Sequence, residues 1–233
     1  MVVPTYNEIE SLAALVGRVR QSVPTADVLV VDDASPDGTG ELADRMAAED
    51  ARIRVLHRAA KDGLGGAYLS GFADAIAGGY EYVVEIDADG SHDPAELPAM
   101  IELARSGADL VIGSRWVPGG EVRNWPRLRQ LISRGGNWYA RTMLRSRIRD
   151  ITAGYRVYRV AALRDLDLTD VSSQGYCFQV ELAWRLERSG HRTAEHPITF
   201  VERVNGVSKM HTGIVVEALF RVTAWGVAAT LKR

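Results

Sequence analysis

The chain has 233 residues, of which 46% are hydrophobic and 25% charged, and its formal net charge is −2. These values are ordinary for a soluble globular protein, and we expect residues 1–233 to form a single domain. A single cysteine, Cys177, excludes an internal disulfide framework and is typical of a reducing compartment. No uninterrupted apolar run reaches the roughly 18 residues that a membrane-spanning helix needs.

The N-terminal part alternates short apolar strands with amphipathic helices. The first strand, at Val2 and Val3, begins directly after Met1, so we expect the chain to be a fragment or one module of a longer protein. The segments that follow are a helix at 9–19, a strand at 28–33, a helix at 40–49, a strand at 53–56, a helix at 67–77 and a strand at 80–86. This order with short connections predicts a parallel, doubly wound sheet.

The C-terminal part is less regular. We expect a helix at 94–105, a strand at 110–116, a mostly helical and amphipathic segment at 118–149, a strand at 155–160, a helix at 175–189, a strand within 191–201, a polar loop at 202–209 and a closing helix at 211–233.

Residues 83–94 suggest a ligand site. An apolar run ends at two carboxylates, Asp87 and Asp89, and Gly90 with an Asp-Pro turn follows. Open α/β sheets bind ligands just outside the carboxyl ends of their strands. Two adjacent carboxylates repel each other unless a cation lies between them, and magnesium or manganese is the usual cation. The alternative is an acidic surface turn, because Asp, Gly, Ser and Pro are common in turns.

Positive charge is concentrated in residues 115–164. This window holds twelve arginines, no lysine and two acids, Glu121 and Asp150, so it carries +10 and the rest of the chain −12. Arginine suits planar, bidentate contacts with phosphate. The block therefore indicates an anionic partner, namely a pyrophosphate, a lipid phosphate, a membrane surface or nucleic acid, and the alternative is a solvated helical face.

Three further segments could complete a site for a nucleoside diphosphate. Asp32 and Asp33 end a strand and could accept hydrogen bonds from a ribose or base, or they form an Asx turn. Glycines in 63–66 precede a helix and could let the backbone approach a ligand, but they match neither a dinucleotide fingerprint nor a phosphate loop. Arg203 and Lys209 lie on a polar loop that could close over leaving phosphates or remain solvated.

The order of these features resembles that of family 2 glycosyltransferases of the GT-A fold. A Pro-Thr-Tyr-Asn-Glu turn follows the first strand, Asp-Asp the second and Asp-Ala-Asp the fourth. Later motifs at 113–115, 151–156, 174–179 and 203–209 are similar to those of polyprenol-phosphate (dolichol-phosphate) mannose synthases. The resemblance covers essentially the whole chain. It implies an α/β GT-A (Rossmann-like) fold, with a mixed, mostly parallel sheet flanked by helices and with amphipathic interface helices.

The resemblance also implies inverting, metal-dependent transfer of mannose from GDP-mannose to a polyprenyl phosphate. By position, the implied sugar-nucleotide contacts are Pro4, Tyr6, Glu8, Asp33, Asp87, Ala88 and Asp89. The implied ligands of a magnesium or manganese ion are Asp89, Asp87 and Ser91. Relatives often have glutamine at the position of Ser91, so the third ligand stays open.

The other implied roles concern the two phosphates. Arg115, Arg129 and Ser133 would receive the lipid phosphate, and Arg203 and Lys209 would contact the leaving diphosphate. The implied catalytic residues are Asp89, Arg115, Arg203 and Lys209. A phosphate monoester, with a second pKa of about 6, is already largely dianionic at neutral pH and needs no general base.

We expect attachment at the cytoplasmic face of a membrane through amphipathic helices in 118–149 and the final helix, or through a partner subunit or a fused membrane domain. The nearest alternative keeps the fold and transfers glucose from UDP-glucose. A nucleic-acid-binding module is a different class, but the strand-end acids would repel a phosphate backbone, so we expect no nucleic acid. A regulatory, inactive homologue would not need the Asp87 and Asp89 pair.

Overall fold

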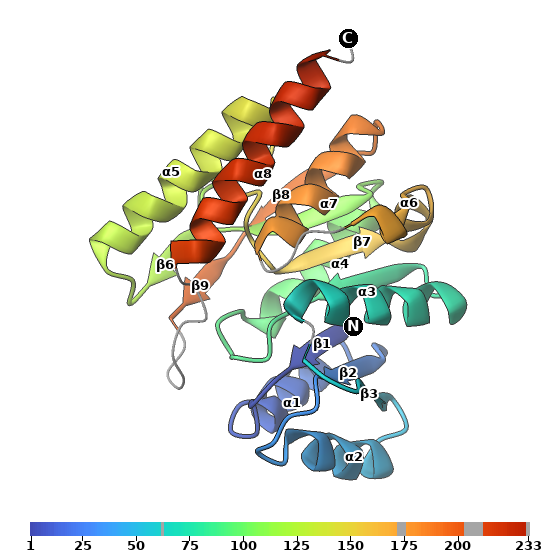
Figure 1. Ribbon diagram of the computed structural model, residues 1–233. Coiled ribbons are helices and arrows are strands. Elements are labelled where there is room, and N and C mark those ends of the chain that lie inside the picture. Colours follow the sequence, from blue (N-terminus) through green and yellow to red (C-terminus); the bar gives the residue numbers. More distant parts are fainter. Residues whose placement is uncertain (62, 172–175, 203–211, 232–233) are drawn as a thin grey trace.

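A computed structural model describes residues 1–61, 63–171, 176–202 and 212–231. One sheet has the strand order β3-β2-β1-β4-β7-β5-β8 (Figure 1). Its strands are β1 (Val2–Thr5), β2 (Val28–Asp32), β3 (Ile53–His57), β4 (Tyr82–Glu85), β5 (Leu110–Ser114), β7 (Arg156–Arg159) and β8 (Thr193–Pro197). β7 is antiparallel to both β4 and β5, and the other pairs are parallel. The mixed, mostly parallel sheet is confirmed, and the N-terminal strands β1 to β4 pair only in parallel among themselves.

Helices cover both faces of this sheet. The helices are α1 (Leu12–Ser22), α2 (Thr39–Glu49), α3 (Gly63–Ala77), α4 (Leu97–Arg105), α5 (Arg127–Leu144), α6 (Val160–Arg164), α7 (Tyr176–Arg188) and α8 (Thr212–Leu231), with short 3-10 turns η1 (Pro94–Glu96) and η2 (Leu168–Asp170). Buried residues of α1, α2 and α4 share one core, and those of α3, α5, α6, α7 and α8 share the other.

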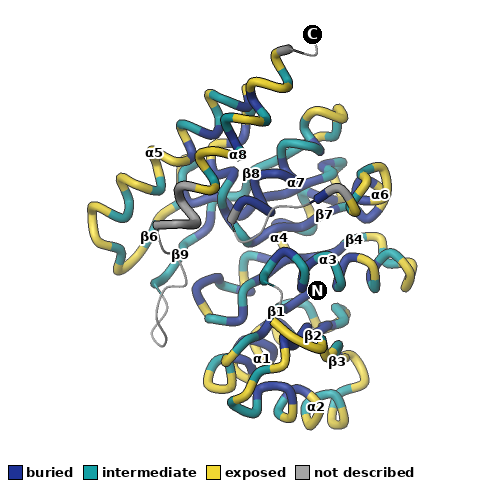
Figure 2. Tube along the Cα trace, viewed as in Figure 1, coloured by how far each residue is buried: buried dark blue, intermediate teal, exposed yellow. Residues whose placement is uncertain are grey.

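Alternation along the strands fills the two cores. Val2 and Val83 belong to the core under α3, whereas their neighbours Val3 and Val84 belong to the core under α1 and α4. Successive side chains of a strand point to opposite faces, so a strand covered on both sides is apolar throughout. The tube in Figure 2 shows the resulting buried centre and the exposed outer turns of the helices.

The glycine segment 63–66 differs from the prediction. It forms the first turn of α3 and is not a loop in front of the helix. Gly65 is buried, and this tertiary packing outweighs the low helix propensity of glycine. The predicted loop conformation is therefore wrong, whereas the approach of this backbone to a ligand stays a prediction.

The segment 118–149 contains α5 and also a short strand. Strand β6 (Glu121–Arg123) pairs in parallel with β9 (Thr199–Val201), so the segment is less helical than predicted. The closing helix α8 lies alongside α5 (Figure 1), where Tyr139 and Thr223 share a hydrogen bond. A Cβ atom at Gly226 would lie 2.5 Å from the Met143 carbonyl oxygen, so glycine is required at this helix contact. Within the described ranges, no helix is both long and apolar enough to cross a membrane.

Candidate active site

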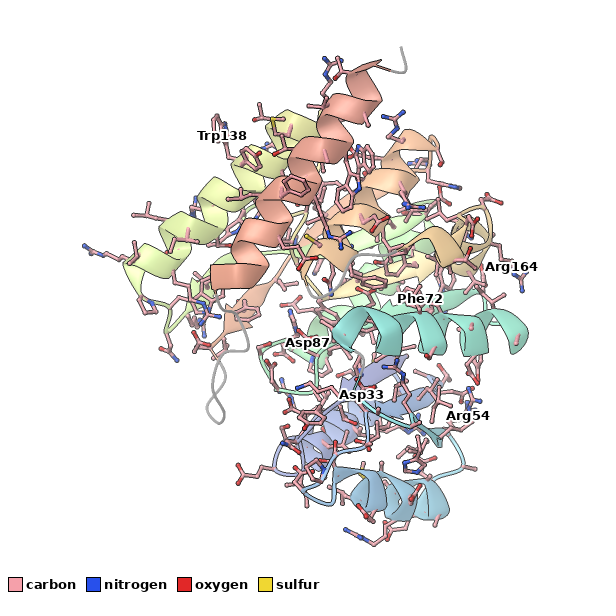
Figure 3. All side chains as sticks on the ribbon, in the orientation of Figure 1. Asp33, Arg54, Phe72, Asp87, Trp138 and Arg164 are labelled. Carbon is pink, nitrogen blue, oxygen red and sulfur yellow. The ribbon has the colours of Figure 1, made fainter. Side chains whose placement is uncertain are left out.

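The site forms where the strand order reverses. β1 lies between β2 and β4, so the chain leaves β1 in one direction and returns on its other side. Asp33 follows β2 and Asp87 follows β4, at the carboxyl ends of strands that flank β1 (Figure 3). Such a switch point leaves a crevice, where open α/β folds bind their ligands.

The turn after β4 presents the predicted acid pair. Ala88 is buried between Asp87 and Asp89, which are both half-buried. The backbone N–H of Ser91 donates to Asp89 Oδ1 at 3.0 Å, and Gly90 has a φ of +74°, a conformation that favours glycine. The turn thus holds the two carboxylates at the strand end.

The turn after β1 lies between the two acidic strand ends. Pro4 is part of β1. The centroid of the Tyr6 ring lies 3.8 Å from the Lys61 ammonium nitrogen. Glu8 accepts a hydrogen bond from Ser11 Oγ at 3.0 Å, and its backbone N–H donates to Thr39 Oγ1. Pro4, Tyr6 and Glu8 therefore lie at the carboxyl end of β1, and the backbone of Glu8 contacts the start of α2; their role in nucleotide binding stays a prediction.

The two acids after β2 have different environments. Asp32 is buried and accepts hydrogen bonds from the Thr5 hydroxyl, the Ser35 hydroxyl and the Ser35 backbone N–H. Asp32 therefore forms the Asx turn predicted from the sequence as the alternative to nucleotide binding. Asp33 is paired with Arg58, whose Nη1 lies 2.6 Å from Asp33 Oδ1.

Ser91 and His92 lie beneath the acid turn. Ser91 is 2% exposed and its Oγ lies 3.4 Å from His92 Nδ1. Burial lowers the pKa of His92 to about 4, although the nearby Asp89 carboxylate opposes this effect. His92 is therefore neutral at physiological pH. The hydroxyl of Ser91 is directed to this ring, so its role as a third metal ligand remains a prediction.

Arg115 is held at the end of β5 by Asp150. Its Nε and Nη2 each donate to a different Asp150 oxygen at 2.7 Å, and its backbone N–H donates to Oδ2 at 2.9 Å. Nη2 also donates to Thr152 Oγ1 at 3.1 Å. This buried network orients the guanidinium group, a contact that the sequence did not indicate.

The other two predicted acceptor residues lie on α5, next to Arg115. The Arg129 guanidinium lies 4.1 Å from the Trp125 ring centroid and pairs with Glu202. Ser133 Oγ accepts a hydrogen bond from Trp116 Nε1, and Arg115 also lies over the Trp116 and Trp125 rings. The structure thus brings Arg115, Arg129 and Ser133 to one arginine-aromatic cluster.

Phe200 connects this cluster to the acid turn. Its ring lies 5.1 Å from the His92 ring and 5.5 Å from the Arg115 guanidinium carbon. Phe200 therefore packs between the acid turn and the arginine-aromatic cluster. Arg203 and Lys209, which were predicted to close over the leaving phosphates, lie outside the described residues.

Three residues beside Asp87 had no role assigned from the sequence. The Tyr68 hydroxyl donates to Asp87 Oδ1 at 3.3 Å, and a Cβ atom at Gly154 would contact both Asp87 Oδ2 and Gln179 Nε2. Gly154 and Gln179 fall within two of the motifs, at 151–156 and 174–179, but Tyr68 gives no local signal because it reads as a core residue of α3.

The donor set fits a hard divalent cation only in part. Among the residues that the structure describes, no three His, Cys, Asp or Glu side chains gather closely enough to hold a metal. Magnesium is commonly held by one or two carboxylates together with substrate phosphates. Asp87 and Asp89 match this kind of site, in which the nucleotide completes the coordination.

The fold and the family match together define a glycosyltransferase of the GT-A type. The sequence matches Glycosyl transferase family 2 over residues 1–167. It is 58% identical over 228 residues to an undecaprenyl-phosphate mannosyltransferase of Micrococcus luteus, covering 98% of this chain and 93% of that protein. It is 52% identical over 234 residues to a polyprenol monophosphomannose synthase of Mycolicibacterium smegmatis, covering 100% of this chain and 88% of the relative.

Solved structures share the fold at lower identity. Glucosyl-3-phosphoglycerate synthase from Mycobacterium tuberculosis, in complex with Mn²⁺ and UDP-glucose, aligns with a TM-score of 0.67 at 19% identity over 97% of this chain and 77% of that one. A mannosyltransferase from Pyrobaculum calidifontis in complex with GDP-Man and Mn²⁺ gives a TM-score of 0.61 at 19% identity, over 100% of this chain and 63% of that one. The chain belongs to glycosyltransferase family 2.

Proposed function

We propose that this chain transfers mannose from GDP-mannose to a polyprenyl phosphate with inversion at the anomeric carbon. The observation that carries the proposal is the 52–58% identity, over essentially the whole chain, to two enzymes named for polyprenyl-phosphate mannosyl transfer. The nucleoside would lie at the carboxyl end of β1, between the ends of β2 and β4, in contact with Pro4, Tyr6, Glu8 and Asp33.

Asp89 would be the first ligand of a magnesium or manganese ion, with Asp87 and Ser91 beside it. Structural neighbours in complex with Mn²⁺ support a divalent metal of this kind. When bound, the metal would neutralise charge on the diphosphate leaving group. Asp87 and Ala88 would also face the ribose and the diphosphate.

The arginine-aromatic cluster would receive the acceptor phosphate. Arg115, fixed by Asp150, presents its guanidinium in one orientation, and Arg129 and Ser133 lie on the adjacent helix. The acceptor phosphate is its own nucleophile, because it is largely dianionic at neutral pH. The residues would therefore act by aligning its oxygen with the anomeric carbon, and Arg203 and Lys209 would stabilise the departing diphosphate.

A membrane surface would supply the lipid acceptor. Leu128, Leu131, Ile132 and Trp138 of α5 are exposed, as are Leu219, Phe220 and Val227 of the adjacent α8. Exposed apolar patches of this kind mark interaction surfaces, and we name these seven residues the α5/α8 apolar surface. The arginines of α5 suit the anionic cytoplasmic leaflet. A partner subunit or a fused membrane domain would be a second means of attachment.

The experiment that tests the proposal measures transfer of radiolabelled sugar to a short polyprenyl phosphate. GDP-mannose and UDP-glucose are compared as donors, each with manganese and with a chelator. We expect product from GDP-mannose that depends on the metal. Faster product formation from UDP-glucose would overturn the assignment of mannose and support the glucosyl alternative.

A further inference from the structure

Gln179 has a buried carboxamide close to the acid turn. It is the fourth residue of α7 and is 2% exposed. Its Oε1 atom has no hydrogen-bond partner in the part of the chain that the structure describes. Buried polar atoms in folded proteins are nearly always paired, with protein, water or ligand, so this oxygen indicates a missing donor.

The space next to this carboxamide is shared with Asp87. A Cβ atom at Gly154 would lie 3.5 Å from Asp87 Oδ2 and 3.9 Å from Gln179 Nε2. Glycine at 154 therefore leaves open a position that contacts both side chains. The carboxylate proposed to face the sugar nucleotide and the carboxamide of Gln179 thus line the same small space.

The residues around this space are held in place by buried contacts. Arg156 is fully buried and donates to the Gln179 carbonyl oxygen and to the Ala153 carbonyl oxygen, both at 2.7 Å. Its guanidinium therefore ties the backbone of α7 to the backbone just before Gly154. On the other side, Tyr68 donates to Asp87 and stacks on Phe178, the neighbour of Gln179, with ring centroids 6.0 Å apart.

We propose that Gln179 is a specificity-determining residue whose carboxamide, which faces this space through Nε2, hydrogen-bonds a hydroxyl group of the transferred hexose. The inference rests on the proposed function, because it requires a sugar nucleotide at Asp87. A hexose hydroxyl is a neutral group that can both donate to and accept from a carboxamide, and a site built to bond a substrate hydroxyl discriminates against sugars that lack it in that position.

The test separates the hexose from the rest of the donor. Binding of a sugar nucleotide and of its matching nucleoside diphosphate is measured by calorimetry with manganese, for the wild type, Gln179→Leu and Gln21→Leu. The donor is whichever of GDP-mannose and UDP-glucose the wild type binds more tightly. Gln21 lies exposed on α1 and provides the same chemical change away from the site.

Gln179→Leu is expected to weaken binding of the sugar nucleotide about tenfold and to leave binding of the nucleoside diphosphate unchanged. Gln21→Leu should change neither. Because leucine fills a similar volume and removes an unpaired polar atom, the melting temperature of Gln179→Leu should not fall. Gln179→Asn, which keeps the amide but shortens the side chain, should show the same selective loss and serves as the second variant.

If both variants lose the same affinity for the sugar nucleotide and for the nucleoside diphosphate, or lose none for either, the proposed role of Gln179 is overturned. A lower melting temperature with unchanged sugar-nucleotide binding would assign the residue a structural role and would also overturn it. A wild type that prefers UDP-glucose would overturn mannose as the donor sugar, while the comparison of donor with diphosphate would still decide the role of Gln179.

Discussion

Arg115 and Asp150 form a buried bidentate ion pair between the end of β5 and the segment before β7. Both guanidinium-to-carboxylate distances are 2.7 Å, and Asp150 is fully buried. The carboxylate also accepts the Arg115 backbone N–H, so it fixes both the main chain and the side chain of a proposed acceptor residue. The ion pair that stabilises the fold here therefore also orients the Arg115 guanidinium in the proposed acceptor site.

Asp150→Asn is expected to lower the free energy of unfolding by about 3–5 kcal/mol, because it leaves the Arg115 charge buried without its counter-ion. Urea unfolding measures this change. Glu102→Gln provides the control, since Glu102 and Arg105 form an exposed pair at 3.9 Å whose loss should cost less than about 1 kcal/mol. Similar decreases in the free energy of unfolding for the two variants would show that the buried pair stabilises the fold no more than an exposed pair.

Asp89→Ala is expected to reduce mannosyl transfer at least about 100-fold, because it removes the first proposed metal ligand. The assay compares wild type and variant with GDP-mannose, a short polyprenyl phosphate and manganese, and circular dichroism checks folding. Asp44→Ala is the control, since Asp44 is an exposed residue of α2 that pairs with His57 and has no proposed role in the site. Unchanged activity of Asp89→Ala would remove the proposed role of this carboxylate.

Glu85 gives the folded protein a pH-dependent stability. Burial raises the pKa of its carboxyl from 4.5 to about 8, although Arg156 opposes this effect. The folded state therefore holds this proton more tightly than the unfolded state, and stability falls as pH rises from about 4.5 to about 8. Glu85→Gln should remove this loss, which we estimate at about 2–4 kcal/mol. Urea unfolding of both proteins between pH 5 and pH 9 measures it, and parallel pH profiles would contradict the assignment.

The α5/α8 apolar surface should govern binding to lipid. Trp138 points outward from α5 (Figure 3) and is 67% exposed, and Phe220 of α8 is 76% exposed. Trp138→Glu and Phe220→Glu should each reduce flotation with anionic liposomes severalfold, because each removes an apolar side chain and adds repulsion. Ile9→Glu, at an exposed apolar residue beside the β1 turn, is the control. A wild type that fails to float at low salt would remove the peripheral-membrane proposal.

Local sequence patterns predicted most of the strands and helices and the acid turn, but not β6 or the helical start of α3 at residue 63. Apolar runs that end in Asp33 and in Asp87 fixed where β2 and β4 stop, because strand ends are marked by the nearest polar and turn residues. The arginine block predicted an anionic partner, and Arg115, Arg129 and Ser133, which the family resemblance singled out, do come together. These features depend on neighbours a few residues apart.

Only the tertiary structure decided the contacts between distant segments. The antiparallel placement of β7, the pairing of Arg115 with Asp150 and the approach of Gln179 to Asp87 all join residues that share no local pattern. A buried polar side chain takes whichever partner the packed sheet and helices bring within hydrogen-bond distance, and that choice depends on strand order. The sequence by itself therefore predicted the strand-end acids and the basic segment, and the fold decided which of these groups face one another and which further residues, such as Asp150 and Tyr68, contact them.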